Sequence, residues 1–160
     1  MSHKQPLGVQ HVAEYFLWKG QSEKKPVTNK KLQKLLYYSQ AWSLVLRDKK
    51  LFDEKIEAWV HGPAVREVYL EYKNFGFDPI SKNIKGEDIE KIPSEVKSLL
   101  DQIWSIYGKY DAAYLEHLTH SEEPWQKARE GLESHIGSAN EISLESMKTY
   151  YSSKLKPKTV

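Results

Sequence analysis

The sequence predicts a mainly α fold, a single compact helical domain with a central buried helix and a minor two-stranded β element. Apolar residues recur at helical spacing through most of the chain, and the spacing changes to two only at residues 56–61. The stretch 29–47 is apolar around most of its circumference, which is typical of a helix buried on most sides. At 160 residues the chain has the size of one ordinary domain. We therefore expect one domain over residues 1–160, with an ordered core at about 7–155.

Composition restricts the possible classes of protein. There is no cysteine, which excludes disulfides, thiolate nucleophiles and cysteine-based zinc sites. No stretch reaches the roughly 18 uninterrupted apolar residues of a membrane span, and the first residues do not resemble a signal peptide. The net charge is only +2, which is far from the basic balance of many nucleic-acid binders. We expect a cytoplasmic protein that does not enter a membrane.

The first helix should begin near Val9, because apolar residues follow it at intervals of three and four, and it should end at Gly20. The central helix should begin after a Thr28 N-cap, with Val27 and Leu32 forming a hydrophobic staple. Its sequence leaves one polar arc, which consists of Gln33, Gln40 and Ser43.

Residues 56–61 alternate between apolar and polar side chains and predict a short strand, which Gly62 ends. A single strand must pair, and the candidate partners are residues 51–52 and 79–84. Pro63 suits the first position of a new helix, where its missing N–H costs nothing. That helix should end at 74–76, before a loop at 76–92 that could hold a second short strand.

The C-terminal half predicts four further helices. Pro93 should open a helix that ends at Gly108, and Asp111 is a plausible N-cap for a short helix over 112–119. Ser121 should cap the next helix, and Ser143 should begin the last one. In all we expect six or seven helices.

Two constellations could support a function other than protein binding. His117 and His120, with nearby carboxylates, could belong to a small metal-dependent hydrolase, although a third ligand from elsewhere would be needed. A basic run with neighbouring aromatic residues could bind nucleic acid; it consists of Lys24, Lys25, Lys30, Lys31, Lys34, Tyr37 and Tyr38. The two tyrosines belong to a helix too apolar to be exposed, so nucleic acid is not the expected partner. The eight glycines stand singly, and no phosphate-binding loop is present.

Trp59 and Trp125 are the aromatic residues of most interest. Trp59 lies on the strand face opposite the apolar residues, and Trp125 begins a helix close to His120. Large amphipathic rings in such positions are commonly part of a core. If exposed, they are natural anchors for a protein partner.

Three segments together resemble the Panacea domain of SocA-like antitoxins, a family that includes phage-associated proteins. They read KLQKLLYYSQAWSL at 31–44, LFDEKIEAWVHGPAVREVYLEY at 51–72 and LTHSEEPWQKAR at 118–129. The similarity extends from about Val9 to Tyr151. Ala64, where a bulkier aliphatic residue is expected, is a small departure from the family pattern.

This resemblance implies an antitoxin that neutralises a cognate toxin protein by direct binding. We expect no catalytic residues, no cofactor and no metal. The residues expected to contact the partner are Trp59, His61, Gly62, Pro63 and Trp125. The metal-dependent hydrolase and the nucleic-acid-binding regulator remain the alternatives, and the oligomeric state is open.

Overall fold

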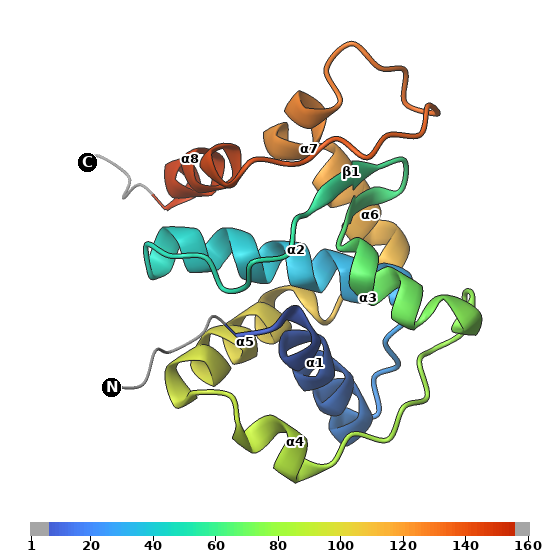
Figure 1. Ribbon diagram of the computed structural model, residues 1–160, viewed down its shortest axis with the longest axis vertical. Helices are drawn as coiled ribbons and strands as arrows, with labels where there is room; N and C mark the ends of the chain where they lie inside the picture. The colour runs from blue at the N-terminus through green and yellow to red at the C-terminus, as the bar shows by residue number, and fades with distance from the viewer. Residues whose placement is uncertain (1–6, 156–160) are drawn as a thin grey trace.

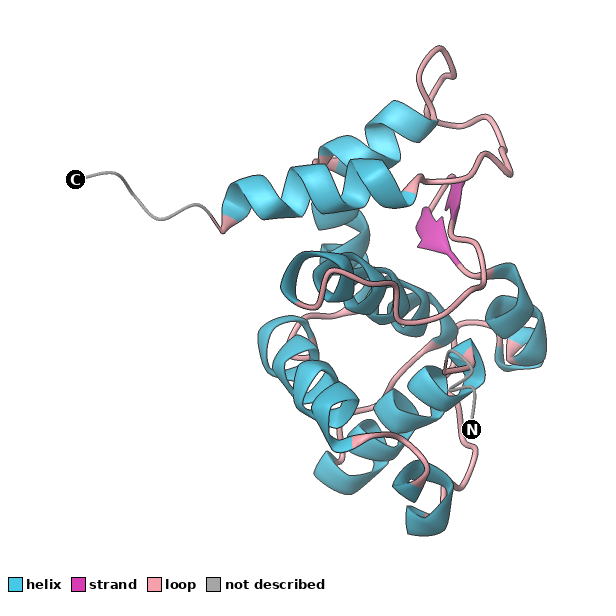
Figure 2. Ribbon diagram, turned by 60° about the vertical axis from the view of Figure 1, so that its left-hand side comes forward, coloured by secondary structure: helices cyan, strands magenta, loops and turns pink. Residues whose placement is uncertain are grey.

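The computed structural model describes residues 7–155, and in this range it confirms the predicted mainly α fold (Figure 1, Figure 2). The described residues form eight α-helices, one short 3-10 helix and one two-stranded antiparallel sheet, so there is at least one helix more than expected. The elements are α1 (Val9–Glu23), α2 (Asn29–Leu46), β1 (Glu57–Trp59), β2 (Gly62–Ala64), α3 (Arg66–Glu71), η1 (Lys73–Phe75), α4 (Gly86–Glu90), α5 (Ser94–Tyr107), α6 (Ala112–His120), α7 (Glu123–Ala128) and α8 (Leu144–Lys154).

The central buried helix is α2, as predicted. It crosses the middle of the molecule, with α8 on one side and α1 and α5 on the other, and it also contacts α6 and β2 (Figure 1). It begins after Thr28, whose side chain accepts a hydrogen bond from the backbone N–H of Lys31. Leu32, Leu35 and Leu36 are completely buried, because neighbouring helices cover the apolar circumference.

The polar arc of α2 is buried too, and its side chains hold neighbouring loops. Gln40 binds both backbone groups of Phe52, accepting from its N–H and donating to its carbonyl. Gln33 accepts from the backbone N–H of Val65 at 2.7 Å. Ser43 donates to a carbonyl in the turn after α2. These three side chains therefore have hydrogen-bond partners, which avoids a desolvation cost of about 1–3 kcal/mol per group.

The predicted end of α1 at Gly20 is wrong, because the helix continues to Glu23 and is capped by Lys24 in a left-handed conformation. Gly20 has a packing role inside the helix. A Cβ at this position would lie 2.6 Å from the carbonyl oxygen of Lys25 and 2.7 Å from a methyl group of Val27. The glycine thus allows the chain that leaves α1 to return closely against it.

The strand is confirmed at β1, but its predicted partner is wrong. β1 pairs with β2, in the register Glu57 to Ala64 and Trp59 to Gly62, and not with residues 51–52 or 79–84. Gly62 has φ +111°, which allows the chain to reverse directly after β1. On its other edge β1 forms an isolated bridge to Glu141, and Ala58 donates to the carbonyl of Asn140, while Ile142 donates to the carbonyl of Ile56 just before the strand.

Pro63 was expected to open a helix, and this prediction is also wrong, because Pro63 lies in β2 and α3 begins at Arg66. Pro63 faces Ala58, whose backbone groups point away from β2: its N–H donates to Asn140 and its carbonyl accepts from Arg129. Since Ala58 needs no donor from the opposite strand, a residue without an N–H fits there.

The remaining helix boundaries depend on local capping. Pro93, Asp111 and Ser143 precede α5, α6 and α8 as predicted. Ser121 does not begin a helix; it ends α6, where its hydroxyl donates to the carbonyl of Leu118. The loop at 76–92 contains the short helix α4, and its only strand-like feature among the described residues is an isolated bridge between Thr28 and Pro79.

Candidate partner-binding groove

A groove with a volume of about 660 Å³ lies where the hairpin of β1 and β2 meets the first turns of α2. Its other walls come from α3 and from residues 76–77 and 137–139. The lining residues are Asn29, Lys30, Gln33, Lys34, Trp59, Val60, His61, Gly62, Ala64, Arg66, Tyr69, Gly76, Phe77, Gly137, Ser138 and Ala139. These residues together are the groove.

Aromatic side chains form one side of the groove. The indole of Trp59 is half-buried and donates to Glu57 at 2.7 Å, and the Tyr69 ring packs against it edge to face at 5.0 Å. The guanidinium of Arg66 lies 5.4 Å from the centre of the same indole and binds Glu57 at 2.9 Å. Phe77 is 93% exposed, and such a ring in a groove wall offers apolar area to a partner.

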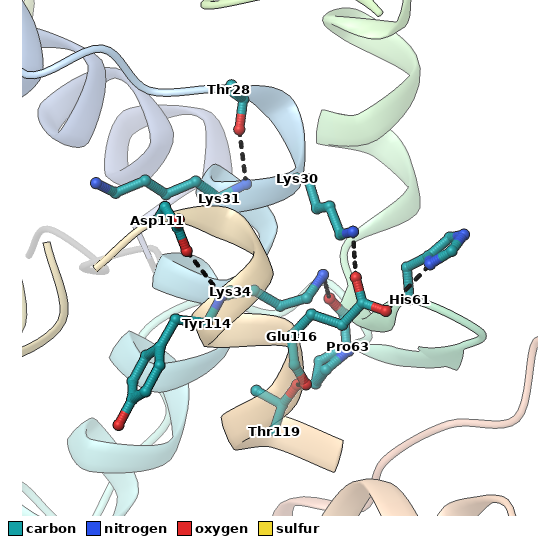
Figure 3. Close-up of polar contacts among 10 residues, drawn as sticks. All are labelled: Thr28, Lys30, Lys31, Lys34, His61, Pro63, Asp111, Tyr114, Glu116 and Thr119. Carbon is teal, nitrogen blue, oxygen red and sulfur yellow. Dashed lines mark hydrogen bonds and ion pairs between the residues drawn. The ribbon is translucent and has the colours of Figure 1, made fainter. Parts of the chain in front are cut away.

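A polar cluster centred on Glu116 adjoins the groove and includes the lining residues Lys30 and His61 (Figure 3). Lys30 from α2 and His61 from the hairpin turn both point to the carboxylate of Glu116 in α6, and His61 Nδ1 lies 3.2 Å from Glu116 Oε2. Burial acts to raise the pKa of Glu116, but the hydrogen bonds from Lys30 and His61 outweigh it, and the pKa is lowered. Glu116 is therefore ionised at neutral pH and holds both basic residues at the groove.

Lys34 lies at the floor of the groove and is almost completely buried, with 2% of its surface exposed. Its Nζ donates to the carbonyl oxygen of Pro63 at 3.2 Å (Figure 3). Burial lowers the pKa of Lys34 to about 7, although nearby Glu116 acts in the opposite direction. The amine therefore changes its protonation state near neutral pH, which is unusual for lysine.

Gly62 and Pro63, both expected to contact the partner, are buried and build the hairpin over Lys34. A Cβ on Gly62 would lie 2.5 Å from Cε of Lys34 and 3.0 Å from Oγ1 of Thr119. Residues 59–63 therefore form the hairpin turn, and the backbone of this turn covers Lys34 at the floor of the groove.

Trp125, the other expected contact, is 8% exposed and lies beneath the hairpin. Its indole donates to the carbonyl oxygen of Trp59 at 2.8 Å and stacks on His120, with ring centres 3.9 Å apart. The guanidinium of Arg129 lies 5.2 Å from the centre of the indole. Trp125 is a core residue that supports Trp59 from below, and the groove lining does not include it.

The two alternative constellations are not assembled into sites. In residues 7–155, no three His, Cys, Asp or Glu side chains are grouped as a metal site would require. His117 is exposed, whereas His120 is half-buried in its stack on Trp125, where burial lowers its pKa.

The basic run that was the alternative for nucleic-acid binding does not form one exposed face. Lys34 is buried, and Lys31 is 7% exposed and donates to the carbonyl of Gly108 at 2.6 Å. Tyr37 and Tyr38 lie in the core, as their helix predicted.

Sequence reasoning missed several groove residues. Arg66 and Tyr69, three residues apart and therefore on one side of α3, both line the groove. Phe77 and residues 137–139 reach the groove from distant loops. Phe77 stands between Gly76 and Asp78 in a polar loop, with no apolar periodicity that would place it in a core. An isolated aromatic residue of this kind indicates an exposed contact position.

Comparison with known protein families matches residues 32–126 to the family described as antitoxin SocA-like, Panacea domain. The matched segment includes the hairpin, Lys34 and Glu116. No curated protein and no solved structure matched the chain. Among the helices of residues 7–155, none has the length and apolar character needed to span a bilayer. Because the match covers more than half of the chain, this protein belongs to the SocA-like antitoxin family and carries its Panacea domain.

Proposed function

We propose that residues 1–160 act as one cytoplasmic antitoxin domain that neutralises a cognate toxin by direct protein–protein binding. Family membership supports the antitoxin role, and in a family of inhibitory proteins no reaction centre is required. The choice of surface rests on the groove, whose lining includes both the 93% exposed ring of Phe77 and the half-buried indole of Trp59.

The binding energy would come mainly from aromatic side chains at the groove. Burying a phenylalanine that is 93% exposed contributes about 1.5–3 kcal/mol. Trp59 is already held by Glu57 and Tyr69, so it would lose little conformational entropy on binding. Such rigid aromatic residues are typical of the few positions that dominate protein interfaces.

The five residues predicted from the sequence would have different roles. Trp59 and His61 would contact the toxin, because both line the groove and keep part of their surface exposed. Gly62 and Pro63 would shape the turn, and Trp125 would hold it in place from the core. We therefore propose a contact surface of Trp59 and His61, extended by Tyr69 and Phe77.

Co-expression with the product of the neighbouring reading frame tests the proposal. Wild-type protein should restore growth and co-purify with the toxin. Phe77→Ser should weaken the complex by about tenfold or more and reduce rescue, because the lost ring contact is worth about 1.5–3 kcal/mol.

The matched control is Ile106→Ser, which removes a 52% exposed apolar side chain of α5 outside the groove. It should bind and rescue as wild type does. Absence of any complex would refute direct binding, and equal behaviour of the two variants would refute the groove as the contact surface.

A further inference from the structure

We propose that the segment of toxin that occupies the groove is acidic, with carboxylates that meet the basic residues of the groove and apolar side chains that meet its aromatic wall. This inference rests on the proposed function, and it specifies the chemistry of the partner.

Basic side chains line the groove and acidic ones do not. Lys30, Lys34, His61 and Arg66 line the groove, whereas no aspartate or glutamate does. Glu116 and Glu57 bind Lys30 and Arg66 without being lining residues, so they position these two basic side chains and offset part of their charge. Complementary charge between two surfaces increases the association rate and disfavours partners of the wrong sign.

Lys34, which the hairpin covers, could act on a partner carboxylate only through its charge and not by direct contact. Among the described residues, its Nζ has one hydrogen-bond partner, the carbonyl of Pro63 at 3.2 Å. The titratable groups that interact with it are Lys30 on α2 and Glu116 and His120 on α6. Of these, only Glu116 favours the ammonium form by its charge, so a partner carboxylate would add to a single existing anion.

The aromatic wall favours an acidic peptide over single-stranded nucleic acid, whose phosphates the same cations would attract. Bases bind by stacking on free ring faces. Arg66 already covers Trp59 at 5.4 Å, and the edge-to-face contact with Tyr69 at 5.0 Å restricts it further. Among the three aromatic rings of the groove only Phe77 is almost completely exposed, and one exposed ring is enough to contact one apolar side chain of a peptide.

The volume of the groove agrees with a short segment as occupant. At about 660 Å³ it falls within the range of about 300–1,000 Å³ that is typical of ligand pockets. A few side chains of an extended segment would fill it. The remainder of a standard interface, about 800 Å² per partner, would lie on the surrounding surface.

Selection from a random library of twelve-residue peptides displayed on phage, with the full chain as target at low salt, tests the inference without knowledge of the toxin. The selected peptides should be rich in aspartate and glutamate, interspersed with leucine, phenylalanine or tryptophan. A fluorescein-labelled copy of one such peptide should then bind in an anisotropy titration.

Two charge-reversal variants provide a matched pair. Arg66→Glu and Lys50→Glu each change the net charge equally, and each removes one exposed ion pair, with Glu57 and with Asp53 respectively. Only Arg66 lines the groove. We expect about tenfold weaker peptide binding for Arg66→Glu and less than a twofold change for Lys50→Glu, because the screening length is about 10 Å at 0.1 M salt.

Several outcomes would overturn the inference. These are selection of basic or uncharged peptides, failure to select any peptide, equal weakening by both variants, and displacement of the peptide by a twelve-residue thymidine oligonucleotide at a similar concentration. A toxin complex that forms normally with Arg66→Glu would refute the acidic segment alone. Absence of any toxin complex would refute the proposed function instead.

Discussion

Replacing Lys34 with methionine should remove a pH dependence of stability that wild-type protein shows above pH 7. Burial lowers the pKa of Lys34 from 10.5 to about 7, so the folded protein releases this proton earlier than the unfolded chain does. At about 1.4 kcal/mol per tenfold change in acidity, the buried ammonium costs the folded state about 5 kcal/mol well below pH 7. This cost disappears gradually as the pH rises toward 10.5, because the unfolded chain then also loses its proton.

Between pH 7 and pH 9 the free energy of unfolding of the wild type should therefore rise by about 2 kcal/mol relative to Lys34→Met. Urea denaturation followed by tryptophan fluorescence measures this difference. The upper limit of pH 9 keeps tyrosines of the unfolded chain, with pKa values of about 10, from contributing. Taking the difference between the two proteins cancels all other titrating groups.

Lys127→Met, which removes an exposed lysine of α7, is the control. Its free energy of unfolding should run parallel to that of the wild type over the same pH range. If the difference between wild type and Lys34→Met is also constant from pH 7 to pH 9, the neutral lysine at the groove floor is refuted.

Three further predictions concern the supports of the groove and the core. Gly62→Ala should lower the free energy of unfolding, measured by urea denaturation, by about 2 kcal/mol, because φ is +111° and the new methyl group would meet Lys34. The control Gly137→Ala has free space around the new methyl group and should change this free energy by less than about 0.5 kcal/mol. Burial raises the pKa of Glu122 in the folded protein despite hydrogen bonds from two buried tyrosines. Wild type should therefore lose stability relative to Glu122→Gln as the pH rises from about 4.5 to 7, because the unfolded chain releases this proton first. A difference in melting temperature between the two proteins that is the same at both pH values would contradict this prediction. Arg129→Met should cost about 3 kcal/mol and expose residues 130–140 to proteases, since Arg129 is buried and binds carbonyl groups of that loop and of β1; a normal proteolysis pattern would be evidence against it.

Elements whose signals are local could be predicted from the sequence. Thr28, Asp111 and Ser143 each bind a backbone N–H three residues later, and this geometry depends only on neighbouring residues. Gly20 and Pro63 were misinterpreted because their roles depend on contacts with distant segments. Gly20 allows close packing by the segment after α1, and Pro63 opposes a strand residue whose hydrogen bonds go elsewhere.

The groove was predictable only in part for the same reason. Trp59 and His61 were identified because they stand in one recognisable turn, and both line the groove. The contribution of Phe77 requires the path of a long loop, which no local pattern specifies. Periodicity placed Lys34 on the apolar helix α2, but its burial under the hairpin, where its amine donates to the carbonyl of Pro63, depends on a segment distant in sequence.

The glutamines of α2 have a consequence for how this protein could diversify. Gln33 and Gln40 recognise main-chain N–H and C=O groups, which are the same whatever side chain is attached. The segments that they tether can therefore change composition without losing their attachment, as long as proline does not remove the N–H at Val65. Val65 is followed directly by Arg66, which lines the groove. Substitutions at such groove positions could change the preferred partner while Gln33 and Gln40 continue to hold the backbone of the same segments.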